Sequence, residues 1–230
     1  MTNPLDNPVW HTLRGPRTDL AEQVRGGTAL RFRSEFSLFA AVEDFDDDAW
    51  NAQAELVGPG GVVFLFRDQV PAPPEGWTEL LRIPTLQLVA GDLSPPPDAA
   101  VITLGDADVE EMLALTKLTE PGPFLPRTHE LGTYVGVRQG SQLVAMAGER
   151  FQMPGWTEIS AVCTHPDARR QGLGAALSLR VAQNIRARGD EAFLHVVETN
   201  ESARLLYESI GFRIRRMMDV VGLQWGEAPD

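Results

Sequence analysis

The chain has 230 residues, of which 43% are hydrophobic and 23% are charged, and these values are ordinary for a globular protein. Its net charge of −12 argues against nucleic acid as a partner, because binding to phosphates needs clustered Lys and Arg. The single cysteine excludes an internal disulfide and fits a reducing compartment. Residues 1–10 show no secretory signal, and the longest apolar runs, such as 61–66, are too short to span a membrane. We therefore predict a cytoplasmic protein that binds neither nucleic acid nor membrane.

A proline-rich stretch at 93–100 divides the chain. Pro95, Pro96 and Pro97 can neither donate to a sheet nor continue a helix, so the stretch predicts a stiff, extended linker. We expect a smaller α/β N-terminal domain over residues 1–92 and a second domain over residues 101–230.

The region before the linker gives mixed signals. Residues 19–24 predict a short helical turn, and 32–42 fit either a helix face or a strand. Residues 62–66 predict a buried strand, and 80–89, interrupted by a proline, predict strand material near a sheet edge. The acidic run at 43–48 lacks the glycine and the terminal glutamate of a calcium loop, so we expect a solvated loop or a helix start.

After the linker the hydrophobic pattern becomes regular. It predicts an α+β fold in which a twisted, mixed and mostly antiparallel sheet is flanked by helices. We expect strands at 101–104, 134–138, 143–151, 157–164, 192–197 and 212–223, and helices at 106–118, 174–188 and 201–210.

The segment at 164–177 carries the clearest chemical signal. A strand ends, Pro166 breaks it, and a turn with Gly172 and Gly174 opens an amphipathic helix. Unpaired N–H groups and the positive end of the helix dipole at such a start bind phosphate groups, and glycine leaves room for their approach. Arg169 and Arg170 add positive charge there. The alternative is an ordinary strand-to-helix turn with surface arginines.

Two segments resemble one known family. Arg169-Arg170-Gln171-Gly172-Leu173-Gly174 resembles the Arg/Gln-x-x-Gly-x-Gly/Ala signature of the GNAT superfamily of N-acetyltransferases. Residues 200–212 resemble its second signature, Asn-x-x-Ala-x-x-Leu-Tyr-Glu-x-x-Gly-Phe. The likeness runs from 101 to 225 and looks closest to the glycine-N-acyltransferase-like branch, in which a divergent N-terminal half precedes the catalytic one. Residues 1–92 would then be either a degenerate GNAT repeat or an unrelated fold.

The resemblance implies a binding site for acetyl-CoA as cosubstrate. Backbone groups of Val162 and Thr164 would pair with the pantetheine arm as if it were an added strand. Residues Arg169 to Gly174 would hold the pyrophosphate through main-chain N–H groups. Asn200 would contact the pantetheine or cap its own helix.

Acyl transfer to an amine also needs two proton-transfer groups. An amine with a pKa of about 10 is mostly protonated at neutral pH, so a base helps it to attack. Our candidate is Glu158, with Glu149 as the alternative, and the competing role for Glu158 is a structural, hydrogen-bonded carboxylate. The resemblance places Tyr207 near the thioester sulfur, where its hydroxyl would protonate the leaving thiolate as general acid, the alternative being a tyrosine that only packs. A backbone N–H near Val162 would stabilise the oxyanion.

Other reactive side chains have simpler explanations. Cys163 lies within a strand and is expected to be a small buried residue. His195 is expected to lie in the core or to line the cleft, with contact to the substrate as the alternative. The four histidines are scattered without ligand spacing, so we predict no metal.

The sequence therefore predicts an acetyl-CoA-dependent N-acetyltransferase that acts by direct attack of a primary amine. The acceptor is a small molecule or a peptide. Two alternatives stay open: an acyl-CoA-binding regulatory module without turnover, and an acyltransferase that uses a longer acyl-CoA. The resemblance also leaves open a homodimer.

Overall fold

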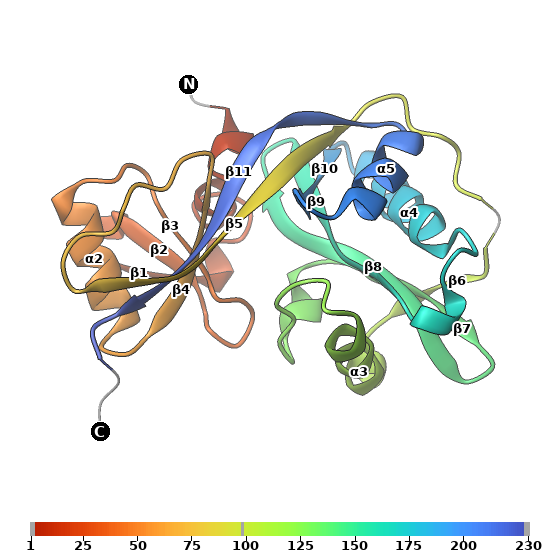
Figure 1. The fold of residues 1–230 in the computed structure, drawn as a ribbon, viewed down its shortest axis with the longest axis horizontal. Helices are drawn as coiled ribbons and strands as arrows, with labels where there is room; N and C mark the ends of the chain where they lie inside the picture. Colours follow the sequence, from red (N-terminus) through yellow and green to blue (C-terminus); the bar gives the residue numbers. More distant parts are fainter. Residues whose placement is uncertain (1–2, 98, 228–230) are drawn as a thin grey trace. The chain divides into compact units, whose positions relative to one another are not determined.

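The structure is a computed structural model that describes residues 3–97 and 99–227, and its chain forms two compact units. Unit 1 takes the residues up to Leu86, Gln152–Pro154 and the residues from Arg216 onward, while unit 2 takes Gln87–Phe151 and Gly155–Arg215. Two long strands, β5 (Trp77–Ala90) and β11 (Phe212–Trp225), therefore contribute residues to both units (Figure 1). The division into 1–92 and 101–230 stays a prediction about independently folding segments.

Unit 1 combines a sheet with two helices. Its strand order is β1-β2-β3-β4-β11-β5. The elements, besides the parts of β5 and β11, are α1 (Pro8–Leu13), β1 (Ala21–Val24), β2 (Ala29–Phe32), β3 (Phe39–Val42), α2 (Asp47–Val57) and β4 (Val62–Arg67), with short 3-10 helices at Pro4–Asp6, Thr18–Leu20 and Arg25–Gly27.

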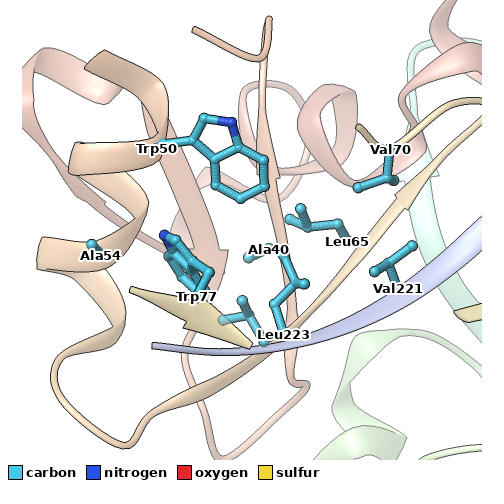
Figure 2. Packing of buried hydrophobic residues seen from close by; sticks show 9 residues of the cluster. Ala40, Trp50, Ala54, Leu65, Val70, Trp77, Val221 and Leu223 are labelled. Atoms are coloured by element: carbon cyan, nitrogen blue, oxygen red, sulfur yellow. The ribbon is translucent and has the colours of Figure 1, made fainter. Parts of the chain in front are cut away.

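Aromatic rings dominate one core cluster of unit 1. The ring centroids of Trp50 and Trp77 lie 5.8 Å apart, and those of Trp77 and Trp225 lie 5.3 Å apart. Figure 2 shows Trp50 from α2 and Trp77 from β5 packed around the aliphatic side chains of the sheet. This burial holds α2 against the sheet, and the three acidic residues at its start, Asp46 to Asp48, lie where the helix dipole favours negative charge. The cluster comprises Ala40, Trp50, Ala54, Val63, Leu65, Val70, Trp77, Val221 and Leu223.

The predictions made for the region before the linker have different outcomes in the structure. The buried strand predicted at 62–66 is confirmed as β4, and the acidic run at 43–48 is a helix start. The helical turn predicted at 19–24 is wrong beyond Leu20, because β1 pairs along its whole length with β2 and this pairing outweighs local preference. The strand predicted at 80–89 is part of β5, which continues through the exposed Pro84 and lies between β11 and β10 in the sheet order, so it is not an edge strand there.

Unit 2 has the mixed sheet predicted for residues 101–225. Its strand order is β11-β5-β10-β9-β8-β7-β6, and Figure 1 shows the strands between α3 on one side and α4 and α5 on the other. The elements are β6 (Val101–Leu104), α3 (Val109–Thr119), β7 (Tyr134–Gln139), β8 (Gln142–Met153), β9 (Trp156–Thr164), α4 (Leu173–Ala187), β10 (Glu191–Val197) and α5 (Glu201–Ser209), with 3-10 helices at Asp106–Asp108, Thr128–Leu131 and Pro166–Ala168. Every predicted element of this region is confirmed within three residues at each end.

The two units share an order of elements. In unit 1, three strands lead through α2 to β4, which pairs in parallel with β3. In unit 2, β7, β8 and β9 lead through α4 to β10, which pairs in parallel with β9. The next two strands are β11 then β5 in unit 1, and β5 then β11 in unit 2. A degenerate repeat of one fold predicts this correspondence, and we propose that relationship.

Candidate functional site

The turn between β9 and α4 presents its backbone to solvent. Arg170 and Gly172 adopt left-handed conformations, with φ of +63° and +75°. Such a conformation is uncommon for a residue with a Cβ, and it turns successive N–H groups toward one side. Among the described residues, no N–H from 170 to 175 donates to a protein acceptor, and α4 has no side-chain N-cap. The predicted pyrophosphate site therefore has free donors at the positive end of a 15-residue helix.

The side chains of this turn leave its backbone accessible. A Cβ on Gly172 would meet no atom within 4 Å, so a phosphate group can approach it. The side chain of Gln171 is engaged with another residue, because its Oε1 accepts a hydrogen bond of 3.0 Å from Gln139. Arg169 and Arg170 are exposed, whereas Leu173 is half-buried as the first residue of α4.

The two signature segments lie side by side. A Cβ on Gly174 would lie 3.5 Å from Cδ1 of Leu206, so the start of α4 packs closely against α5 (Figure 1). Asn200 caps α5, because its Oδ1 accepts a 3.1 Å hydrogen bond from the N–H of Ala203. The predicted capping role of Asn200 is thus confirmed, while its contact with pantetheine stays a prediction.

The parallel pairing between β9 and β10 covers only the first part of β9. Their parallel pairing ends with Ile159 and Leu194. Beyond that point Ala161 has a φ of +52°, which bends β9. Val162 and Thr164 follow this bend and are half-buried. The pairing of Val162 and Thr164 with pantetheine stays a prediction, and the carbonyl of Thr164 accepts a 3.4 Å hydrogen bond from Arg169 Nε.

Tyr207 lies in α5 and is buried, with its ring 6.1 Å from that of Phe212 in an edge-on arrangement. Burial raises the pKa of the Tyr207 phenol above its usual value near 10, and the nearby Cys163 thiol adds to the shift. The hydroxyl therefore keeps its proton at neutral pH. Cys163 itself is buried, as expected, and burial raises its pKa to about 11, so it is no nucleophile at neutral pH.

The two candidate carboxylates are buried and already engaged. Both oxygens of Glu158 accept hydrogen bonds of 2.7 Å from Arg150, and Oε1 also lies 2.6 Å from His195 Nδ1. Burial opposes its ionisation, but Arg150 and His195 outweigh burial and lower the pKa of Glu158 to about 2. Glu149 accepts a 2.8 Å hydrogen bond from Arg188. A carboxylate with so low a pKa is a weak proton acceptor, so this geometry favours a structural role for Glu158 over that of a base.

The sequence alone does not predict that Arg150, Glu158 and His195 contact one another. His195 was expected in the core or lining the cleft, and Arg150 was not singled out. Arg150 and Glu158 stand at equal distances from Pro154, in the strands predicted at 143–151 and 157–164, and this symmetry is a signal in the sequence for their pairing. Within residues 3–97 and 99–227, no group of three or more His, Cys, Asp or Glu is arranged to hold a metal ion. In the same residues, every helix is too short or too polar to cross a lipid bilayer.

Comparison with known proteins agrees with this geometry. A family model for FR47-like proteins matches residues 134–220. A GCN5-related N-acetyltransferase from Kribbella flavida shares the fold, with a TM-score of 0.62 and 21% identity over 95% of this chain and 94% of that one. Mycothiol acetyltransferase from Thermobispora bispora is 45% identical over 56 residues, which span 24% of this chain and only 19% of that protein.

A third relative covers the whole chain. It is a solved structure from Novosphingobium aromaticivorans that is assigned to the GNAT family of acetyltransferases. It is 38% identical, with a TM-score of 0.88, and the alignment covers 99% of this chain and 100% of that one. Since both signature segments, the sheet order and this full-length relative agree, the chain belongs to the GNAT family of N-acetyltransferases.

Proposed function

We propose that the protein moves the acetyl group of acetyl-CoA to a primary amine of a small molecule or peptide by direct attack, in the cytoplasm. The observation that carries this proposal is the row of free N–H groups from Arg170 to Ala175 at the uncapped start of α4. A pyrophosphate satisfies such donors, and neither an internal carboxylate nor a side-chain cap competes for them. Arg169 and Arg170 add charge at the same place.

The rest of the cosubstrate extends from this anchor. The pantetheine arm pairs with backbone groups of Val162 and Thr164, beyond the point where β9 and β10 separate. Asn200, at the start of α5, closes the other side of this path. The thioester then lies toward Tyr207, whose neighbour Cys163 belongs to the same strand end.

The reaction forms a C–N bond and breaks the C–S bond. The amine attacks the thioester carbonyl, and a backbone N–H near Val162 stabilises the oxyanion. Tyr207 gives its proton to the leaving sulfur, and the burial that keeps its proton in place also disfavours a free thiolate. The proton of the amine passes to the group of polar side chains around Glu158.

Acyl chain length and acceptor depend on space beside this site. A hollow of about 590 Å³ lies between the end of α3 and the following loop. Phe124, on its rim, and Ala161, at the bend of β9, pack against the same core cluster. This hollow is our candidate for the acceptor, or for a longer acyl chain in the alternative donor. It is lined by Leu113, Thr116, Lys117, Glu120, Gly122, Pro123 and Phe124.

Titration calorimetry of acetyl-CoA into the wild type and Tyr207→Phe tests the proposal, followed by release of free thiol with a panel of primary amines. We expect both proteins to bind, and kcat of Tyr207→Phe to fall by about 100-fold, because a general acid contributes about that much. A wild type that binds no acetyl-CoA contradicts the proposal. Binding without turnover of any amine favours the regulatory module, and turnover only with longer donors favours the second alternative.

A further inference from the structure

A chain of hydrogen bonds crosses five neighbouring strands of unit 2. Arg215 Nη1 donates to Gln87 Oε1 at 2.7 Å, and Gln87 Nε2 lies 3.1 Å from His195 Nε2. His195 Nδ1 lies 2.6 Å from Glu158 Oε1, and Arg150 donates to both oxygens of Glu158. The five side chains come from β11, β5, β10, β9 and β8, which is also the order of these strands in the sheet. We call Arg215, Gln87, His195, Glu158 and Arg150 the polar ladder.

The two ends of the polar ladder fix the direction of every hydrogen bond in it. A guanidinium only donates, so the oxygen of Gln87 faces Arg215 and its NH₂ group faces His195. His195 Nε2 must then accept, which leaves the ring proton on Nδ1, where it donates to Glu158. His195 is therefore neutral in this arrangement, with its basic lone pair on Nε2.

The position of His195 suits contact with the reacting amine. It is the first residue of β10 beyond the last pair with β9, at the start of the opening in which we place the thioester. Its side chain is 4% exposed and that of Glu158 is 1% exposed, so their hydrogen bond is shielded from water. Phe193 packs edge-on against the imidazole with centroids 5.5 Å apart, which holds the ring in place.

Resting on the proposed function, we propose that His195, not Glu158, takes the proton of the attacking amine, and that Glu158 and Gln87 are positioning residues. When the C–N bond forms, the amine proton moves to Nε2 of His195, and Glu158 stabilises the resulting imidazolium. The new N–H displaces the hydrogen bond from Gln87 Nε2, while the oxygen of Gln87 stays with Arg215. As the C–S bond breaks, Tyr207 protonates the sulfur, and His195 later returns its proton through solvent to Tyr207.

The charges around His195 support this division of roles. Burial lowers the pKa of His195 from 6.5, the charge of Arg150 lowers it as well, and the hydrogen bond and charge of Glu158 raise it. A base that is neutral at the working pH and becomes charged beside a fixed carboxylate is well placed to accept a proton. Glu158 is instead held ionised and acts through His195.

The first test reads the tautomer without any turnover. Long-range ¹H–¹⁵N NMR of the histidine-labelled protein shows which ring nitrogen carries the proton, and His195→Gln identifies the signal. We expect a neutral ring with its proton on Nδ1 at neutral pH. A proton on Nε2, or a doubly protonated ring, overturns the proposal whether or not the protein is an acetyltransferase.

The second test moves the pKa of His195 in two directions. Gln87→Glu supplies an acceptor for the imidazolium and should raise that pKa by about one unit, whereas Glu158→Gln removes the anionic partner and should lower it by a similar amount. The acidic limb of the kcat/KM profile, measured with acetyl-CoA and the amine that turns over, should move the same two ways. A merely structural role predicts lower activity with an unmoved limb, and that result overturns the proposal.

The third test compares two histidines. His195→Gln should lower kcat by about 100-fold while leaving the Kd for acetyl-CoA and the melting temperature nearly unchanged. His11→Gln, in unit 1, is the control and should leave kcat as it is. An unchanged kcat in His195→Gln overturns this inference alone, whereas a wild type that turns over no amine refutes the proposed function and the role of His195 with it.

Discussion

The turns that precede α2 and α4 occupy corresponding places in the two units, yet their chemistry is opposite. Each connects a strand with the helix that leads to its parallel neighbour. Before α2, the Oδ1 of Asp46 accepts a 2.8 Å hydrogen bond from the N–H of Ala49, and Asp47 and Asp48 follow in the first turn. Before α4, Gly172 makes no side-chain cap, and no acidic residue lies in the first turn.

On the proposed function, the same arrangement serves stability in unit 1 and cosubstrate binding in unit 2. The helix dipole and the free N–H groups attract negative charge in both places. α2 satisfies them with its own carboxylates, which repel an external phosphate. α4 leaves them unsatisfied, so an external anion becomes the stabilising partner. Sites for acetyl-CoA are therefore expected in unit 2 and not in unit 1.

A carboxylate introduced before α4 would make this turn resemble the turn before α2, and we expect it to have the largest effect on acetyl-CoA affinity. Gly172→Glu places negative charge and a side chain where Gly172 now faces open space. Because like charges in such contact cost several kcal/mol, we expect acetyl-CoA affinity to fall by about 100-fold or more, measured by calorimetry.

Gly155→Glu is the matched control for this change. Gly155 also has a positive φ, +78°, and also faces open space, but it lies in the turn between β8 and β9. Its replacement introduces the same backbone strain and the same charge without touching the proposed site. Equal losses of affinity in both variants would mean that general charge or strain, not the turn before α4, governs binding.

Removal of the two arginines before α4 should lower acetyl-CoA affinity by a smaller factor. If main-chain N–H groups do most of the binding, Arg169→Ala combined with Arg170→Gly should weaken acetyl-CoA binding by about tenfold, since exposed ion pairs are each worth up to about 1 kcal/mol. Glycine also accepts the φ of +63° found at Arg170 more easily. The loss should shrink in high salt.

Arg180→Ala serves as the comparison for that variant. Arg180 is an exposed residue farther along α4, so its removal changes net charge by one without reaching the turn. We expect no measurable change in affinity. Complete loss of binding in the double variant would instead show that the arginine side chains, and not the backbone, hold the pyrophosphate.

The same contrast explains how much the sequence could predict. Main-chain binding needs particular residue types in one short segment, such as Gly172 at a positive φ, so the segment before α4 was visible in the sequence. The polar ladder draws each residue from a different strand, and Gln87 and His195 are 108 positions apart. No local spacing records such a contact. β1 escaped prediction for a related reason, because its pairing with β2 and not its own residues decides its conformation.

Removal of the N-cap of α2 should have the smallest effect of these changes and should lower only the free energy of unfolding. Asp46→Ala leaves the N–H of Ala49 without its acceptor, and loss of an N-cap costs about 1 kcal/mol of the free energy of unfolding. Asp47→Ala, which removes a first-turn charge but no cap, should cost only a few tenths of that. Denaturant titration measures both, and acetyl-CoA affinity should stay at the wild-type value.

Weaker acetyl-CoA binding by Asp46→Ala would mean that unit 1 takes part in binding, and would contradict the contrast between the two turns. An unchanged affinity with the expected destabilisation would leave the contrast intact, with the acidic start of α2 serving stability alone.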